Sequence, residues 1–211
     1  AHTLLTASLD TLPDPFLMAE MARAVDRLRL ARQRPDSVLV YGDYDVDGMT
    51  AAACVTELCR SLGLDTRTEV QPRRGGAHGL SRDAVDRAHA EGRTLLFTAD
   101  CGMSNDDEIA HATSLGIDVI IIDHHQQAAQ RPPALAVLNP ARPECGYPFK
   151  PLCAAGVAFT FVRAATEALG GPRPLDLYLD LVALGTVADA VPLIGDNRVL
   201  VRDGLVALGR R

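Results

Sequence analysis

Three short apolar runs in this sequence each lead directly into an aspartate, and this arrangement constrains the fold more than any other feature. The runs read V-L-V-Y-G, L-L-F-T-A and V-I-I-I, and the aspartates that follow them are Asp43, Asp100 and Asp123. Apolar runs of this length are typical of buried strands, and segments of helical periodicity separate them. Because the carboxyl ends of parallel strands meet at one edge of a sheet, we expect the three aspartates to lie close together.

The alternation of strand-like and helical segments predicts an α/β fold, with a mostly parallel sheet and helices on both faces. The expected strands are 38–41, 66–70, 94–99 and 117–122, and the helices between and before them are 14–34, 49–62, 81–91 and 104–115. Three more helices, at 154–169, 175–186 and 197–208, would form a C-terminal helical cap. We therefore expect one domain over 1–211, with an α/β core at 1–150 and a helical part at 151–211.

Carboxylates are crowded at the first strand end, where Asp43, Asp45 and Asp47 occupy alternate positions. In a partly dry cleft such groups repel one another and take up protons, unless a multivalent cation lies among them. Two histidines, His124 and His125, adjoin the third strand end. A site of carboxylates with an imidazole suits manganese or magnesium better than zinc or copper. The sequence therefore favours a metal site.

The acidic stretch has two other interpretations. A calcium-binding EF-hand loop also begins D-x-D-x-D-G, but it needs a glutamate at its twelfth position, where this chain has Cys54. A solvated acidic turn is the second alternative, since such turns are common. A lone turn does not account for three acidic strand ends that converge, so the metal site remains the favoured interpretation.

Composition and charge set wider limits. Of 211 residues, 47% are hydrophobic and 23% are charged, which is ordinary for a globular protein. The five cysteines lack C-x-x-C spacing, which argues against a disulfide framework or a zinc knuckle. A net charge of −6 disfavours a nucleic-acid partner, although divalent cations among the acids would cancel part of it. We see no signal segment and no apolar run of about 18 residues, so we expect a cytoplasmic protein with no membrane partner.

Four motifs, in this order and at this spacing, resemble those of the DHH phosphoesterase superfamily. They are G-D-Y-D-V-D-G at 42–48, T-A-D-C-G at 98–102, I-D-H-H at 122–125 and L-G-T-V-A-D-A-V-P at 184–192. The first motif, together with Y-P-F-K-x-L-C and G-V-A-F at 147–159, is similar to the RecJ branch of exonucleases specific for single-stranded DNA. The resemblance spans 15–208 and implies the catalytic core of a longer enzyme, whose second substrate-binding domain is absent from this chain.

This resemblance implies a centre of two divalent ions, usually Mn2+, with Mg2+ as the alternative. Asp45 and Asp47 correspond to the ligands of the first motif, one for each ion. Asp100 corresponds to a carboxylate that bridges both ions. Asp43 corresponds to a nearby acid that ligates an ion or orients water.

The remaining catalytic positions follow in the third and fourth motifs. His124 corresponds to the histidine ligand of the more buried ion, and Asp189 to the last carboxylate of that ion. Asp123 corresponds to the residue that orients the histidine from outside the ligand set. His125 falls where the family places a residue that contacts the phosphate.

The resemblance also suggests residues for contact with DNA, and it is less close there. The candidates are Arg73, Arg74, His78, Lys150 and Gly156. His78 stands where a tyrosine is common in relatives, and Ala154 departs from the glycine usual before A-G-V-A. Both departures concern contacts with the substrate and leave the expected metal ligands unchanged.

The implied function is metal-dependent hydrolysis of phosphodiesters: a 5′-to-3′ exonuclease that releases mononucleotides from single-stranded DNA in repair and recombination. A single-strand-binding protein and a helicase would be partners of the full-length enzyme. One alternative is an oligonucleotide or cyclic-dinucleotide phosphodiesterase of the same superfamily, whose first motif usually has a histidine where this chain has Tyr41. An alternative of another class is an inactive scaffold that binds replication or repair partners, which the retention of every ligand position disfavours.

Overall fold

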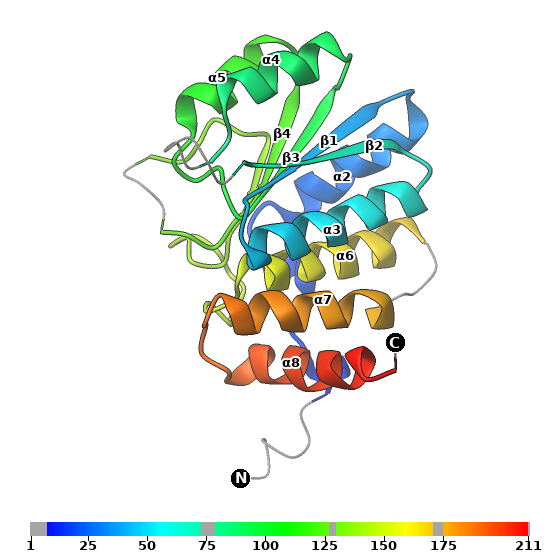
Figure 1. The fold of residues 1–211 in the computed structure, drawn as a ribbon, viewed down its shortest axis with the longest axis vertical. Coiled ribbons are helices and arrows are strands. Elements are labelled where there is room, and N and C mark those ends of the chain that lie inside the picture. The colour runs from blue at the N-terminus through cyan, green and yellow to red at the C-terminus, as the bar shows by residue number, and fades with distance from the viewer. Residues whose placement is uncertain (1–7, 73–78, 127–129, 171–174, 211) are drawn as a thin grey trace.

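The computed structural model describes residues 8–72, 79–126, 130–170 and 175–210, which form a parallel sheet with helices around it (Figure 1). The five strands lie in the order β2-β1-β3-β4-β5. They are β1 (Ser37–Gly42), β2 (Asp65–Val70), β3 (Leu95–Ala99), β4 (Asp118–Ile122) and β5 (Ala136–Leu138). The described helices are α2 (Met21–Gln33), α3 (Val46–Ser61), α4 (Arg82–Ala90), α5 (Asp106–Ser114), α6 (Ala154–Leu169), α7 (Leu175–Ala188) and α8 (Gly195–Leu208), with short 3-10 turns at η1 (Leu9–Thr11) and η2 (Pro15–Leu17).

Helices cover both faces of the sheet, because successive side chains of each strand point to opposite sides. In β1, Val38 and Val40 pack with α2, α3 and α6, whereas Leu39 and Tyr41 pack with α4 and α5. Figure 1 shows α4 and α5 on one side of the sheet and α3 and α6 on the other. The predicted α/β class with a parallel sheet is therefore confirmed.

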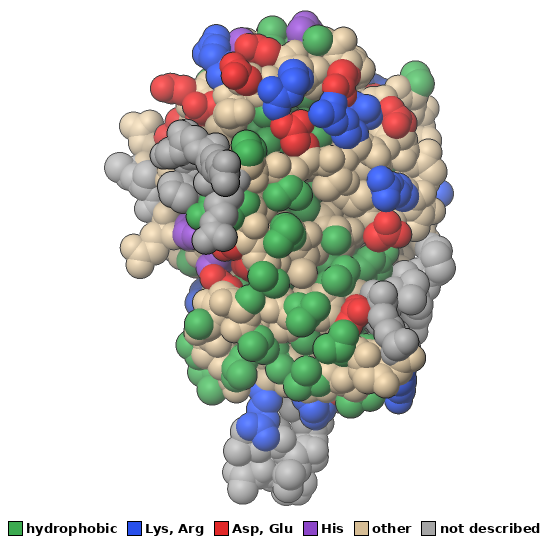
Figure 2. All heavy atoms as spheres, viewed as in Figure 1, with side chains coloured by type: hydrophobic (Ala, Val, Ile, Leu, Met, Phe, Trp, Pro, Cys, Tyr) green, Lys and Arg blue, Asp and Glu red, His purple; other side chains and the backbone are tan. Residues whose placement is uncertain are grey.

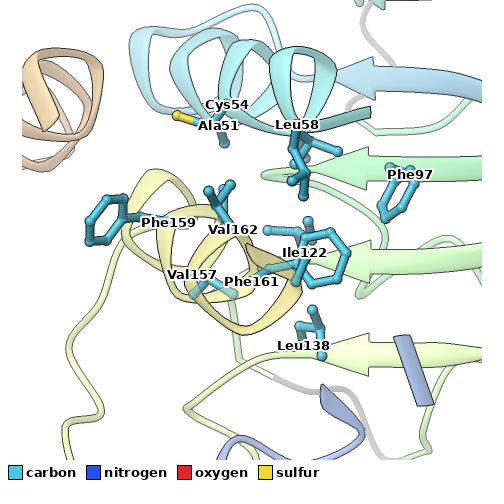
Figure 3. Packing of buried hydrophobic residues seen from close by; sticks show 14 of the residues in the cluster. Ala51, Cys54, Leu58, Phe97, Ile122, Leu138, Val157, Phe159, Phe161 and Val162 are labelled. Carbon is cyan, nitrogen blue, oxygen red and sulfur yellow. The ribbon is translucent and has the colours of Figure 1, made fainter. Parts of the chain in front are cut away.

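The larger core lies between the sheet and α6, as Figure 3 shows. Phe161 of α6 points toward Ile122 of β4 and Phe97 of β3, and the two phenylalanine rings are 5.6 Å apart at 45°. Leu58 of α3 closes the same cluster. Burying one such side chain contributes roughly 1.5–3 kcal/mol, so this layer fixes α3 and α6 firmly against the strands.

Helix α7 packs on α3 and α6 at the side away from the sheet, and α8 packs in turn on α7 (Figure 1). The two helices approach closely at Gly204 of α8, where a side chain would collide with the carbonyl oxygen of Leu179 on α7. Within the described part of the chain, no helix is both long enough and apolar enough to cross a membrane.

The predicted helix at 14–34 is wrong in its first part. Asp14 instead caps the turn η2 by accepting from the main-chain nitrogen of Phe16 (2.8 Å), and α2 begins only at Met21. The break lies at Glu20, whose φ is +63°. Its carboxylate binds Arg131, Arg142 and the main-chain nitrogen of Val137. This tertiary ion cluster outweighs the helical tendency of the local sequence.

One helix begins three residues earlier than predicted and one strand was not predicted, whereas the bounds of the remaining predicted elements agree to within two residues. Helix α3 begins at Val46, earlier than predicted, because Asp45 accepts from the main-chain nitrogen of Gly48 (2.9 Å) and caps it. The acidic stretch therefore turns into a helix after Asp45. Strand β5 was not predicted, and it pairs with β4 over Ile120–Ile122. In contrast, α6 has the predicted bounds of 154–169.

Candidate metal centre

The three predicted strand ends meet because their strands are neighbours in register. Gly42, Ala99 and Ile122 lie side by side across β1, β3 and β4. The residue after each strand extends the ladder, since Asp43 N donates to Ala99 O (3.0 Å) and Asp100 N to Ile122 O (2.9 Å). Strand β2 lies on one side of β1 and β3 on the other, so this edge is the switch point where α/β sheets bind ligands.

Asp47 is held by the beginning of α6. One of its carboxylate oxygens accepts from the main-chain nitrogen of Ala154 (2.6 Å) and the other from that of Ala155 (2.8 Å). The positive end of a helix dipole favours a carboxylate at this place. Burial raises the pKa of Asp47 all the same, because its side chain is only 1% exposed. Asp47 thus joins α3 to α6 at the edge of the site.

Asp100 occupies a strained position directly after β3. Its φ is +63°, a conformation that costs a non-glycine residue of order 1–3 kcal/mol and is common at functional sites. Burial raises the pKa of this carboxyl to about 7, with His124 opposing the shift and neighbouring carboxylates adding to it. A carboxyl held in this way is stabilised as the anion only if positive charge is brought beside it.

His124 is the side chain on which the acids converge. Its Nε2 atom lies 3.2 Å from Oδ1 of Asp100 and 3.7 Å from Oδ2 of both Asp47 and Asp189. Asp189 follows α7, so this last acid comes from the helical part of the chain. The structure therefore unites residues that lie far apart in the sequence.

The donor atoms fall into three overlapping groups that could each hold a cation. In each group the potential ligand atoms lie within 4.8 Å of one another. The groups are Asp47, His124 and Asp189; Asp43, Asp45 and Asp100; and Asp100, His124 and His125. All six predicted ligand positions, including Asp43, occur in these groups, and two groups share Asp100. Their role as ligands remains a prediction.

Two buried atoms of the cluster give a further indication that its residues fit a divalent cation. Oδ1 of Asp100 and Nε2 of His124 are buried, and among the described residues neither atom has a hydrogen-bond partner of acceptable geometry. A buried polar atom left in this way costs about 1–3 kcal/mol. Several oxygen donors with one imidazole form a set suited to Mn2+ or Mg2+. A bound cation would serve as a partner for both atoms. It would also favour the ionised form of Asp100, whose pKa is raised.

Asp123 orients the ring of one histidine, and that histidine is His125. The Oδ1 atom of Asp123 accepts from the ring Nδ1 of His125 (2.7 Å) and from the main-chain nitrogens of His124 (2.7 Å) and His125 (3.0 Å). Its Oδ2 atom accepts from the main-chain nitrogen of Met103 (3.2 Å). The bond from Asp123 raises the pKa of His125 to about 9. This corrects the sequence-based interpretation, in which Asp123 orients the histidine that ligates the metal.

The predicted DNA contacts remain predictions. Arg73, Arg74 and His78 lie outside the described residues. Lys150 is exposed and donates to the carbonyl oxygen of Cys145 (2.6 Å), and none of its described contacts reaches the acidic cluster. Gly156 is buried in the first turn of α6 against Leu152, so the structure does not support direct contact between Gly156 and DNA.

Sequence reasoning missed Asn139, which follows the unpredicted strand β5. Leu138 pairs with Ile122, so Asn139 continues the row of polar residues at the strand ends. Its side-chain amide is fully buried and donates from Nδ2 to the carbonyl oxygen of His125 (2.8 Å). The run A-V-L before Asn139 repeats the pattern of an apolar run that ends in a polar residue, but it is only three residues long.

A cavity of about 230 Å³ opens beside the cluster, next to Asp43, Asp100 and His125. Its other wall includes Gly102 and Asn105. Figure 2 shows histidine and acidic side chains together at one margin of the molecule, with apolar side chains beside them. A substrate group held in this cavity would contact the imidazole of His125 and the acids at once.

Comparisons with known proteins found similar sequences over most of the chain. The family model described as "DHH family, N-terminal domain" matches residues 37–186. The single-stranded-DNA-specific exonuclease RecJ of Bacillus subtilis is 37% identical over 197 residues, covering 93% of this chain and 24% of that protein. The RecJ of Escherichia coli is 40% identical over 200 residues, covering 89% of this chain and 34% of that protein.

A solved structure of exonuclease RecJ bound to manganese has the same fold. It superposes with a TM-score of 0.81 at 36% identity, covering 90% of this chain and 48% of that one. The present chain thus spans about a quarter to a third of the length of the two curated relatives. The range of the family model, 37–186, contains the three acidic strand ends and both histidines and ends shortly before Asp189.

Proposed function

The chain belongs to the DHH family, and on that premise we propose that it is the catalytic part of a metal-dependent exonuclease that hydrolyses single-stranded DNA. The observation that carries the proposal is the approach of Asp100 Oδ1 to His124 Nε2 at 3.2 Å within a ring of carboxylates. Both atoms are buried without a hydrogen-bond partner of acceptable geometry among the described residues, so a cation would complete them. The similarity to RecJ exonucleases supports the reaction and the substrate class.

The donor groups suggest how the chain would hold two divalent ions. Asp47, His124 and Asp189 would hold one ion, and Asp43 and Asp45 would serve the other. Asp100 shares a donor group with Asp43 and Asp45 and also approaches His124 of the other group, so it would lie between the ions. When bound, such ions supply an activated water and neutralise the charge that develops on the phosphoryl oxygens.

The residues of the chain then position the reacting groups. Asp123 fixes the ring of His125 through Nδ1, so Nε2 remains for the substrate. The hydrogen bond from its ring to Asp123 raises the pKa of His125, which favours the protonated ring. An imidazolium beside the cavity can bind a phosphoryl oxygen or give a proton to the leaving oxygen. General acids of this kind contribute roughly 10² to 10⁴ in rate.

The wider setting of the enzyme is part of the proposal. We propose single-stranded DNA as substrate, 5′-to-3′ polarity and mononucleotides as products. In the full-length enzyme a single-strand-binding protein and a helicase would act as partners, in repair and recombination, in the cytoplasm. The helical part, 151–211, would complete the catalytic domain by supplying Asp189.

Cleavage of labelled DNA tests the proposal. We expect release of mononucleotides from single-stranded DNA with Mn2+, slower release with Mg2+ and little with Ca2+, whose longer bonds misplace the attacking water. Duplex DNA without a single-stranded end should resist cleavage. Full activity in the presence of a chelator, or the highest activity with Zn2+, would show that the site works by other chemistry.

A further inference from the structure

The row of polar residues at the strand ends includes two that are neither acidic nor metal-ligand candidates, Gln71 after β2 and Asn139 after β5. Of these two, Asn139 binds the chain at His125. Asn139 directly follows β5 and is 0% exposed. An amide in such a place needs partners for its donors and acceptor, because burying them unpaired costs about 1–3 kcal/mol. Its partners therefore show which part of the site it serves.

The two ends of the Asn139 amide have different partners. Oδ1 accepts from the main-chain nitrogen of Ala141 (2.8 Å), and Nδ2 donates to the carbonyl oxygen of His125 (2.8 Å). The orientation of the amide is determined, since Ala141 offers a donor and the carbonyl of His125 an acceptor. The amide thus connects the turn after β5 to the chain at His125.

His125 is held at its ring and at both of its main-chain polar groups. Asp123 fixes the main-chain nitrogen and the ring, and Asn139 fixes the carbonyl group. An imidazole that must meet a substrate oxygen loses much of its effect if its backbone shifts by about 1 Å. We propose that Asn139 is a positioning residue that sets His125 for its contact with the scissile phosphate. The inference deepens the proposed function and rests on it.

Two substitutions separate the bonds of Asn139. Asn139→Ala removes both bonds, whereas Asn139→Asp keeps an acceptor for Ala141 and loses the donor to His125. We expect both variants to lower the single-turnover rate of DNA cleavage by about 10- to 100-fold, with unchanged KM and unchanged bound manganese. An Asn139→Asp variant of wild-type rate would show that only the turn at Ala141 matters and would overturn the inference.

A double-mutant cycle distinguishes positioning from general support of the fold. If Asn139 acts through His125, Asn139→Ala should change the rate less than about twofold in a His125→Ala background. The matched control is Asn197→Ala, which removes an equally buried amide that donates to the carbonyls of Pro151 and Pro192. The control should have the same effect with and without His125. Equal effects of Asn139→Ala in both backgrounds would contradict the inference.

A readout that does not need activity keeps this test apart from the test of the proposed function. Hydrogen exchange in the full-length protein, followed in the peptide that carries His124 and His125, should speed up about tenfold in Asn139→Ala and stay unchanged in Asn197→Ala. If the wild type fails to cleave DNA, the proposed function is wrong, and the exchange comparison still reports on Asn139. Unchanged exchange in Asn139→Ala would overturn the inference in either case.

Discussion

Oδ1 of Asp123 lies 2.7 Å from Nδ1 of His125, and this bond gives the two adjacent histidines different surroundings. The ring of His125 is bound to Asp123 and is 59% exposed. The ring of His124 is 17% exposed and directs Nε2 toward the acids of the cluster. The sequence motif makes the two histidines look equivalent, whereas the structure separates them.

The first prediction therefore concerns this pair. His124→Ala should weaken the affinity for manganese by at least about 10- to 100-fold, because it removes a proposed ligand of the ion. His125→Ala should keep its metal and lose about 10² to 10⁴ in cleavage rate. Metal content by mass spectrometry and single-turnover cleavage check both variants. His111→Ala is the control, since its ring pairs with Asp86 on the surface. A His125→Ala protein that arrives without metal would reverse the assignment.

The second prediction concerns Asp47, whose two oxygens bind the first amides of α6. Asp47→Asn would place an NH2 group against a main-chain donor, which costs roughly 1–3 kcal/mol of stability. It would also remove a proposed metal ligand, so Mn2+ should no longer raise Tm. In the wild type Mn2+ should raise Tm by mass action. Thermal unfolding with and without Mn2+ measures both effects. Equal stabilisation of variant and wild type by Mn2+ would exclude Asp47 from the ligand set.

The third prediction concerns the close approach of α7 to the site. A Cβ on Gly185 would lie 2.6 Å from Oγ1 of Thr50 and 2.9 Å from Oδ1 of Asp47. Gly185→Ala should therefore destabilise the fold by about 1–3 kcal/mol and weaken manganese binding. Gly209→Ala is the matched control, because the nearest atom to its Cβ would be 3.6 Å away. Urea unfolding and manganese titration compare the two. Equal effects of both substitutions would contradict the packing argument.

The fourth prediction concerns stability at low pH. Burial alone would raise the pKa of Glu20, but hydrogen bonds from Arg131 and Arg142 lower it to about 2, from 4.5. A carboxyl with a lowered pKa contributes stability that is present above pH 4.5 and is lost as the pH falls toward 2. Glu20→Gln should therefore cost up to roughly 3 kcal/mol at neutral pH and much less in strong acid.

Chemical unfolding across this pH range measures the effect of Glu20→Gln. The control is Glu57→Gln, which breaks an exposed pair with Arg60 at 3.5 Å and should cost less than about 1 kcal/mol at each pH. A cost of Glu20→Gln that does not change with pH would show that packing, rather than charge, holds Glu20.

The fold and the acidic cluster were largely predictable because their signals are local. Each buried strand is an apolar run, and the acid that follows it must lie at the carboxyl edge of the sheet. The sequence alone therefore predicts that Asp43, Asp100 and Asp123 lie together. The same pattern is too weak at β5, which is only three residues long, and so Asn139 was missed as well.

Other features of the fold and of the site depend on contacts that no local pattern reveals. Glu20 lies in a segment of helical periodicity, but Arg131 and Arg142 bind it across the fold and break the helix. The motif places Asp123 next to both histidines, and only the rotamers of the structure show that it binds the ring of His125. Such contacts are tertiary, so sequence periodicity does not encode them.

Anomalous scattering from crystals grown with Mn2+ shows directly whether the cluster holds two ions. We predict two manganese peaks, both in contact with the carboxylate of Asp100. One peak should also contact His124 and Asp189, and the other Asp45. Crystals of His124→Ala should lose the first peak. A single peak away from Asp100, or no peak in the cluster at saturating Mn2+, would contradict the proposed metal centre.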